Sequence, residues 1–176
     1  MLEEIHAKDD HMGVGVLGGR VIFRVLCDFG YEDLAIKMIT RPDQPSYGCM
    51  IADGLTTLGE TPRPPYSSLN HHFWGDISSW YVKTILGIRV NPFEENVNNI
   101  NIEPHFIESL DFAEGWYDTL CGKLSVKWER VGGDVKLTVD CPEGIVGHIK
   151  LPFGFKTNDR YVLELKSGEY IASKVY

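Results

Sequence analysis

The spacing of the apolar residues changes once along the chain, and this change limits the possible folds more than any other feature. Up to about residue 90 they recur every three or four positions, as in amphipathic helices. From about residue 97 they alternate with polar residues, as in strands with one buried face. The sequence NPFEENVNN separates the two patterns. We therefore expect an α+β chain, with an N-terminal helical segment followed by an antiparallel β-sandwich.

The helical segment is expected to span residues 1–92, with helices at 14–28, 31–40 and 69–86. A loop rich in Pro, Gly and Thr lies between the second and third helices, at residues 41–67. Loops of this length inside a compact domain usually carry function. We therefore look for a site in this loop and at the start of the helix that follows it.

The sandwich is expected to span residues 93–176. Candidate strands lie at 99–103, 115–118, 122–130, 134–140, 145–151, 160–165 and 169–175. The sequence VGGD at 131–134 is typical of a hairpin turn. Leu124, Val126 and Trp128 alternate with polar residues, which predicts that they share one buried face.

The composition excludes several classes of protein. Hydrophobic residues make up 43% of the chain and charged residues 24%, so we expect a packed core. The net charge is -8 without a basic cluster, which argues against a nucleic-acid partner. No apolar run is long enough for a membrane span. The acidic start MLEEIHAKDDH does not resemble a signal peptide, and the location, cytoplasmic or periplasmic, stays open.

Partial motifs for cofactors and metals are present, but their contexts do not fit. The glycines at 13–18 match GxGxxG, yet the preceding residues do not form the strand that a dinucleotide site requires. His71 and His72 are adjacent, so on a helix their side chains point about 100° apart. None of the four cysteines forms a CxxC pair, which favours buried free thiols over disulfides or a zinc site. We therefore expect no metal and no cofactor.

The stretch 45–81 has the residue types of a carbohydrate site. It contains Glu60, Asn70, His71 and Trp80, and aromatic faces stack on sugar rings while polar groups bond the hydroxyls. Hydrolysis of a glycosidic bond with inversion needs two carboxyl groups on opposite faces of the sugar, one as general acid and one as general base. Glu60 is a candidate base. The plainer interpretation of Glu60 is an exposed glutamate in a surface loop.

Four separate blocks of this region resemble the bacterial α-L-rhamnosidases of glycoside hydrolase family 78. The blocks are HMGVG at 11–15, PSYGCMI at 45–51, GLTTLGE at 54–60 and SLNH at 68–71, with further matches at Gly75, Trp80, Tyr117, Gly122 and Trp128. Members of this family are inverting enzymes with an (α/α)6 barrel followed by a C-terminal β-sandwich. The resemblance implies that this chain supplies the last quarter of such a barrel and most of the sandwich.

The resemblance also implies roles for individual residues. Glu60 falls on the general base of the family and His71 on a histidine of the sugar pocket, while Asn70 and Trp80 belong to the same motifs as substrate-binding residues. The general acid of the family lies upstream of this stretch, so we expect the isolated chain to be inactive on terminal α-L-rhamnosyl linkages. The chain departs from the family at two positions beside the glutamate. Gly59 and Pro62 stand where the family usually has Trp.

Two further hypotheses remain open at this point. The sandwich is alternatively a non-catalytic carbohydrate-binding or structural module, with Trp116, Tyr117 and Trp128 either stacking on sugars or packing in the core. Barrel helices without their neighbours expose an apolar stripe, so we also expect self-association into homo-oligomers.

Overall fold

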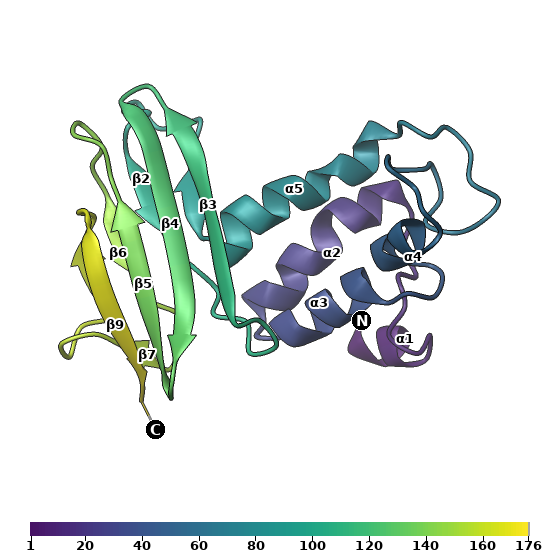
Figure 1. Ribbon diagram of the computed structural model, residues 1–176, viewed down its shortest axis with the longest axis horizontal. Helices are drawn as coiled ribbons and strands as arrows, with labels where there is room; N and C mark the ends of the chain where they lie inside the picture. Colours follow the sequence, from purple (N-terminus) through teal and green to yellow (C-terminus); the bar gives the residue numbers. More distant parts are fainter. Residues whose placement is uncertain (176) are drawn as a thin grey trace. The chain divides into compact units, whose positions relative to one another are not determined.

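The computed structural model describes residues 1–175 and divides into two compact units between Trp80 and Tyr81 (Figure 1). Residues 1–80 form the helical unit, and the residues from 81 onward form the sheet unit, which contains all the strands described. This order of helices and antiparallel sheets confirms the predicted α+β class. The domain division predicted at residues 92 and 93 lies further along the chain than the unit boundary, and it stays a prediction.

The helical unit is built around the two helices that the apolar spacing predicts. Its elements are α1 (Leu2–His6), α2 (Val16–Asp28), α3 (Glu32–Thr40), α4 (Tyr47–Ala52), the 3-10 helix η1 (His72–Gly75) and α5 (Asp76–Trp80). α2 buries Phe23 and Leu26 and α3 buries Met38 in the core of this unit. α2 and α3 confirm the helices predicted at 14–28 and 31–40.

The helix predicted at 69–86 begins later than expected. The backbone amide of Asn70 donates to the carbonyl of Ser68, and that of His71 donates to the carbonyl of Leu58. Because the loop binds both amides, these residues precede the helix instead of forming its first turn. His71 has extended backbone and is the N-cap of η1. After α5 the helix continues as a π-helical segment, η2 (Tyr81–Ile85), which belongs to the sheet unit.

The loop predicted at 41–67 contains one helix, α4. Ser46 caps it, because its hydroxyl oxygen accepts a hydrogen bond of 2.8 Å from the backbone amide of Cys49. The Ser46 hydroxyl also donates to the carbonyls of Arg41 and Asp43, with oxygen–oxygen distances of 2.6 and 2.9 Å. With six residues, α4 is too short to show a helical period in the sequence, although the serine at its start is a recognisable signal.

The face of α2 away from the core carries exposed apolar residues. Leu17 is 75% exposed and Val21 is 43% exposed. Self-association through such a face stays a prediction. None of the helices in residues 1–175 has both the length and the apolar character needed to cross a bilayer.

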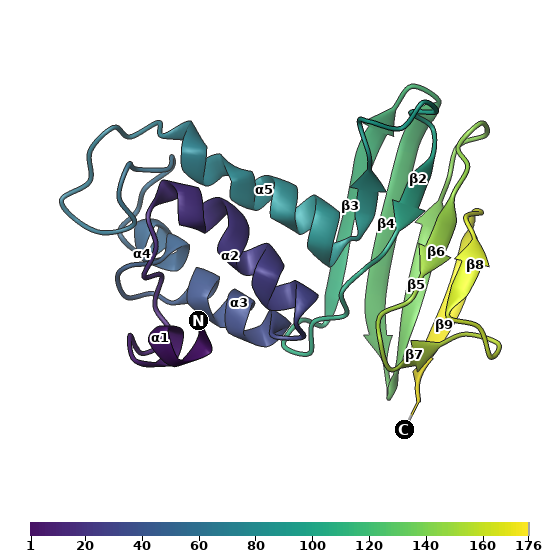
Figure 2. The same cartoon turned by 180° about the vertical axis from the view of Figure 1, so that it is seen from behind.

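The sheet unit contains two sheets, which lie face to face (Figures 1 and 2). The four-stranded sheet has the order β1-β2-β6-β8, with β1 (Ile88–Val90), β2 (Ile100–Ile102), β6 (His148–Lys150) and β8 (Val162–Glu164). The five-stranded sheet has the order β3-β4-β5-β9-β7, with β3 (Phe112–Thr119), β4 (Gly122–Val131), β5 (Asp134–Asp140), β9 (Gly168–Lys174) and β7 (Phe155–Lys156). The short strands β1 and β7 were not expected from the sequence.

The predicted alternation is confirmed in the central strands of the larger sheet. Leu124, Val126 and Trp128 on β4 are fully buried, and Trp128 pairs across the sheet with the equally buried Leu137. The indole Nε1–H of Trp128 donates to the carbonyl of Ile85 at 2.9 Å, so its one polar atom is satisfied in the core. β4 and β5 are joined by the predicted two-residue turn at 132–133.

One strand pair departs from the antiparallel arrangement. β2 and β6 run parallel, with Ile102 opposite Ile149, whereas the other pairs between the described strands are antiparallel. Gly147 permits this approach, because a Cβ there would lie 1.9 Å from the carbonyl oxygen of Ile100 and its φ is 146°. Such a long-range parallel pair leaves no signature in the local alternation of residues.

Candidate functional site

A cavity of about 540 Å³ lies within the helical unit. Its walls come from residues 12–16 before and at the start of α2, from 60–63 in the long loop, and from Lys8, Pro45, His71 and Trp74. Of the four residues expected in the site, Glu60 and His71 line this cavity together. A carboxylate and an imidazole from separate segments therefore meet at one hollow, as a sugar site requires.

The backbone of Glu60 is held on both sides while its carboxylate is left accessible. Its amide donates to the carbonyl of Ser67 at 2.8 Å, and its carbonyl accepts from the indole Nε1–H of Trp74 at 2.8 Å. The carboxylate Oε2 accepts a longer hydrogen bond, 3.3 Å, from the hydroxyl of Ser67. The residue as a whole is exposed. A carboxylate with a fixed backbone and one weak neighbour retains acceptor positions for a water molecule.

His71 lines the same cavity, and one of its ring nitrogens is buried without a partner among the described residues. Its Nδ1 is buried and has no hydrogen-bond partner within residues 1–175. The imidazole lies 5.4 Å from the ring of Phe73, centroid to centroid, and the backbone amide is fixed to Leu58 at 2.8 Å. Leaving a buried polar atom unpaired costs free energy, so such atoms in native proteins call for an explanation.

Trp74 positions the site, although no role for it follows from the sequence. It is 2% exposed, and its indole holds the carbonyl of Glu60. The hydroxyl of Tyr47 donates to the carbonyl of Trp74 at 3.0 Å, and the two rings meet edge to face at 5.8 Å. Residue 19 must be Gly, because a Cβ there would lie 2.4 Å from the Trp74 ring. Trp74 thus links α2 and α4 to the backbone of the candidate base.

The other two residues predicted for sugar binding lie outside the cavity lining. Asn70 is exposed in the loop. Trp80 is 6% exposed and packs against Phe23 of α2, with ring centroids 6.0 Å apart. The apolar spacing of α5 already places Trp80 on the buried face of its helix, and this core position outweighs its resemblance to a sugar-stacking residue. Neither residue is part of the site proposed below.

Tyr66 fastens the long loop to α4 on the other side of Glu60. Its hydroxyl donates to Asp53 Oδ2 at 2.8 Å and lies 3.2 Å from the Cys49 sulfur. Burial raises the pKa of Tyr66 well above its usual value, and the neighbouring Cys49 and Asp53 add to this effect. The ring also lies 3.3 Å from where a Cβ of Gly59 would be, so the small residue at 59 lets Tyr66 pack there.

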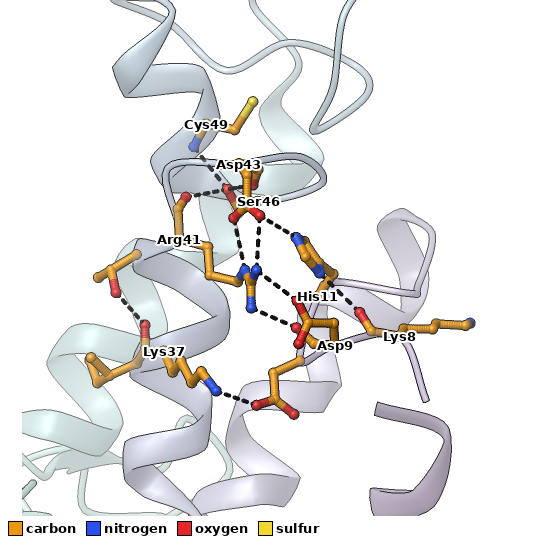
Figure 3. A network of polar contacts seen from close by, with 11 residues as sticks. Lys8, Asp9, His11, Lys37, Arg41, Asp43, Ser46 and Cys49 are labelled. Carbon is orange, nitrogen blue, oxygen red and sulfur yellow. Dashed lines mark hydrogen bonds and ion pairs between the residues drawn. The ribbon is translucent and has the colours of Figure 1, made fainter. Parts of the chain in front are cut away.

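A charged network holds two of the cavity walls together (Figure 3). The Arg41 guanidinium donates to the Asp43 carboxylate at 2.8 Å through Nε and at 2.8 Å through Nη2. It also reaches the Asp9 carbonyl at 2.6 Å and its carboxylate at 3.0 Å. The Met12 amide donates to the Pro45 carbonyl at 3.3 Å. Because Met12 and Pro45 line the cavity, the network fixes the segment before α2 against the segment before α4.

This network predicts a loss of stability in acid. Hydrogen bonds from Arg41 hold the pKa of Asp43 well below its usual value, and those from Lys37 and His6 lower the pKa of Asp10. A carboxyl whose pKa is lowered by folding stabilises the native state above its unfolded pKa, and this contribution disappears as pH falls. We expect the thermal midpoint to fall between about pH 5 and about pH 3, with a smaller fall in Arg41→Gln. Circular dichroism melts across this range measure both slopes.

Arg24→Gln is the matched control for this experiment, because Arg24 is exposed on α2 and makes no ion pair within residues 1–175. It removes the same charge as Arg41→Gln. A pH slope for Arg41→Gln equal to that of Arg24→Gln and of the unaltered chain would contradict a role of the network in acid stability.

Comparison with protein families identifies both units. Residues 1–85 match the family described as bacterial alpha-L-rhamnosidase 6 hairpin glycosidase domain. Residues 87–163 match the bacterial alpha-L-rhamnosidase C-terminal domain. The two matches meet close to the end of η2.

Individual relatives agree with the family matches. The chain is 28% identical over 158 residues to an alpha-L-rhamnosidase of Streptomyces avermitilis and 31% identical over 151 residues to one of Alteromonas sp.. These alignments cover 84% and 79% of this chain, but 15% and 16% of the relatives. The chain thus spans about one sixth of the length of the curated relatives that it matches.

Solved structures show the same fold over nearly the whole chain. The alpha-L-rhamnosidase from Dictyoglumus thermophilum superposes with a TM-score of 0.83 at 27% identity, covering 99% of this chain and 22% of that one. The Streptomyces avermitilis enzyme, solved with L-rhamnose, gives a TM-score of 0.80 at 24% identity, covering 97% and 19%. The chain therefore belongs to the bacterial α-L-rhamnosidase family, with part of the 6 hairpin glycosidase domain followed by the C-terminal domain.

Proposed function

We propose that this chain supplies the general base and part of the sugar pocket of an inverting glycoside hydrolase that acts on terminal α-L-rhamnosyl groups. One observation carries the proposal: Glu60 and His71 line the same cavity, the first with an accessible carboxylate and the second with an unpaired buried nitrogen. The relatives described above are alpha-L-rhamnosidases, which supports the sugar named.

In this proposal Glu60 removes a proton from a water molecule on one face of the sugar. The water oxygen bonds to the anomeric carbon as the bond from that carbon to the leaving oxygen breaks, so the configuration inverts. A general acid on the opposite face protonates the leaving oxygen, and the aglycone departs as an alcohol. His71 fixes the sugar through a hydrogen bond between its imidazole and a hydroxyl group. The clamp formed by Ser67 and Trp74 on the backbone of Glu60 keeps the base in place during the reaction.

The chemistry of inversion predicts that this chain alone does not hydrolyse rhamnosides. Inverting glycosidases need two carboxyl groups about 6.5–9.5 Å apart. Within residues 1–175, Glu60 is the one carboxylate that lines the cavity. We expect no turnover of p-nitrophenyl α-L-rhamnoside above the buffer rate, measured by release of p-nitrophenol from the purified chain. The Streptomyces avermitilis enzyme serves as the positive control. Saturable turnover by the chain that Glu60→Gln removes would contradict this prediction.

A second candidate function is favoured by one exposed residue of the sheet unit. Trp116 on β3 is 56% exposed and points away from the buried face that Gly115 shares with Leu86. Exposed tryptophans on sheets are able to stack on sugars, which supports a non-catalytic carbohydrate-binding module. The Lys123 ammonium already lies over this ring, 4.7 Å from its centroid, and competes for that face. Calorimetric titration of the whole chain with L-rhamnose separates the two candidates: the pocket loses binding in His71→Ala, whereas the module loses it in Trp116→Ala.

A further inference from the structure

The amide and the carboxylate of Glu60 are both bound by one residue, Ser67. The Ser67 carbonyl accepts the amide proton at 2.8 Å, and the Ser67 hydroxyl donates to the carboxylate Oε2 at 3.3 Å. These two bonds close residues 60–67 into a loop. Ser67 is itself exposed, so its position depends on what holds the residue beside it.

That residue is Tyr66, which is fastened to the end of α4. Its hydroxyl donates at 2.8 Å to the carboxylate of Asp53, the C-cap of the helix, and lies 3.2 Å from the Cys49 sulfur. Tyr66 is half-buried, and burial together with these two neighbours raises its pKa well above the usual value. The hydroxyl therefore keeps its proton, and its bond to Asp53, throughout the pH range in which a carboxylate acts as a base.

The start of α4 supports the other side of Glu60. The hydroxyl of Tyr47, the first residue of the helix, donates to the carbonyl of Trp74 at 3.0 Å. The indole of Trp74 donates in turn to the carbonyl of Glu60 at 2.8 Å. One short helix thus fixes the carbonyl side of Glu60 from its first turn, and it fixes the amide side from its last turn through Tyr66 and Ser67.

We infer that Tyr66 is a positioning residue for the candidate base, because its bond to Asp53 fixes Ser67 and thereby the place of the Glu60 carboxylate. The inference rests on the proposed function and deepens it. Tyr66 is not among the residues of 1–175 that line the cavity, so it acts on the reaction through Glu60 and not on the sugar. A shift of about 1 Å in a reacting group lowers a rate by up to about a hundredfold. Loss of the Tyr66 hydroxyl therefore lowers kcat and leaves KM nearly unchanged.

The test measures hydrolysis of p-nitrophenyl α-L-rhamnoside by a chimera in which this chain replaces the matching segment of the Dictyoglumus thermophilum enzyme. We expect Tyr66→Phe to lower kcat about tenfold and to change KM by less than about twofold. Tyr31→Phe is the control, because it removes a hydroxyl from an exposed tyrosine of the same unit that does not line the cavity, and both constants stay unchanged. Asp53→Asn keeps an oxygen that accepts from Tyr66 and retains most of kcat, whereas Asp53→Ala repeats the loss.

Azide separates positioning of the base from damage to the pocket. In Glu60→Gly, azide forms a bond to the anomeric carbon as the bond to the leaving oxygen breaks, and the general acid protonates that oxygen, so no base is needed. We expect the same rate of p-nitrophenol release with azide in Glu60→Gly with and without Tyr66→Phe. A loss in the azide reaction equal to the loss in hydrolysis would mean that Tyr66 supports the whole pocket, and would overturn the inference.

Failure of the inference and failure of the proposed function give different results. A large loss of kcat in Glu60→Gln beside an unchanged kcat in Tyr66→Phe overturns the inference alone. A kcat that Glu60→Gln leaves unchanged contradicts the proposed function. Thermal melts show whether each variant folds, and if Tyr66→Phe does not, Asp53→Ala and Asp53→Asn make the same comparison: equal kcat values for these two would overturn the inference.

Discussion

Glu60→Gln is expected to lower kcat for rhamnoside hydrolysis about a thousandfold in an enzyme whose 6 hairpin domain is complete. Glutamine keeps the size of the side chain and its bond with Ser67, but it cannot accept a proton from the attacking water. The measurement uses a chimera in which this chain replaces the matching segment of the Dictyoglumus thermophilum enzyme, which has the same fold over 99% of the chain. Such a chimera regains the opposite carboxyl group that inversion requires.

Two companion variants make this result specific to a general base. Glu4→Gln removes an exposed carboxylate of α1 that does not line the cavity, and we expect it to leave kcat unchanged. In Glu60→Gly, added azide attacks the anomeric carbon without needing a proton acceptor, so the rate recovers and a β-configured rhamnosyl azide accumulates. A kcat for Glu60→Gln within a few-fold of the unaltered chimera would remove Glu60 from the mechanism.

Trp128→Ala is expected to lower the free energy of unfolding of the sheet unit by about 3–5 kcal/mol. The indole is fully buried between the sheets, 5.7 Å from the ring of Phe106, and it satisfies the carbonyl of Ile85. Its removal leaves both a large cavity and an unpaired backbone acceptor. Urea unfolding followed by far-ultraviolet circular dichroism gives the difference from the unaltered chain.

Trp116→Ala provides the matched comparison, because the same residue type stands on the neighbouring strand β3 with more than half of its surface exposed. Its truncation removes the contact with Lys123 and opens no cavity in the core, so we expect a change below about 1 kcal/mol. Equal losses for the two tryptophans would mean that Trp128 is not the centre of this core.

The sheet unit follows from its sequence more directly than the helical unit does. On β4 and β5 every second residue is apolar, and the register is closed by a two-residue glycine turn, so local pattern and final pairing agree. The parallel contact of β2 with β6 depends on residues far apart in the chain, and no local pattern reports it. α4 shows no period in the sequence, because a helix of six residues is shorter than the window in which a helical period is detectable.

The sequence indicates the candidate site residues that have distinctive chemistry, but not those whose position depends on packing. Glu60 and His71 stand out by residue type and by family motif, and both line the cavity. Trp74 and Trp80 both lie close to His71 in the sequence, and the resemblance assigns a sugar-binding role to Trp80 and none to Trp74. Three-dimensional packing separates them: Trp74 reaches the Glu60 carbonyl, while Trp80 turns into the core beside Phe23.

The central claim is that one sugar contacts both Glu60 and His71 in the cavity of the helical unit. A crystal structure of this chain grown with L-rhamnose tests it most directly. We predict density for one sugar in the cavity, with hydroxyl oxygens at about 2.6–3.2 Å from the His71 imidazole and from the Glu60 carboxylate. Rhamnose bound on the Trp116 face with the cavity empty would contradict the claim.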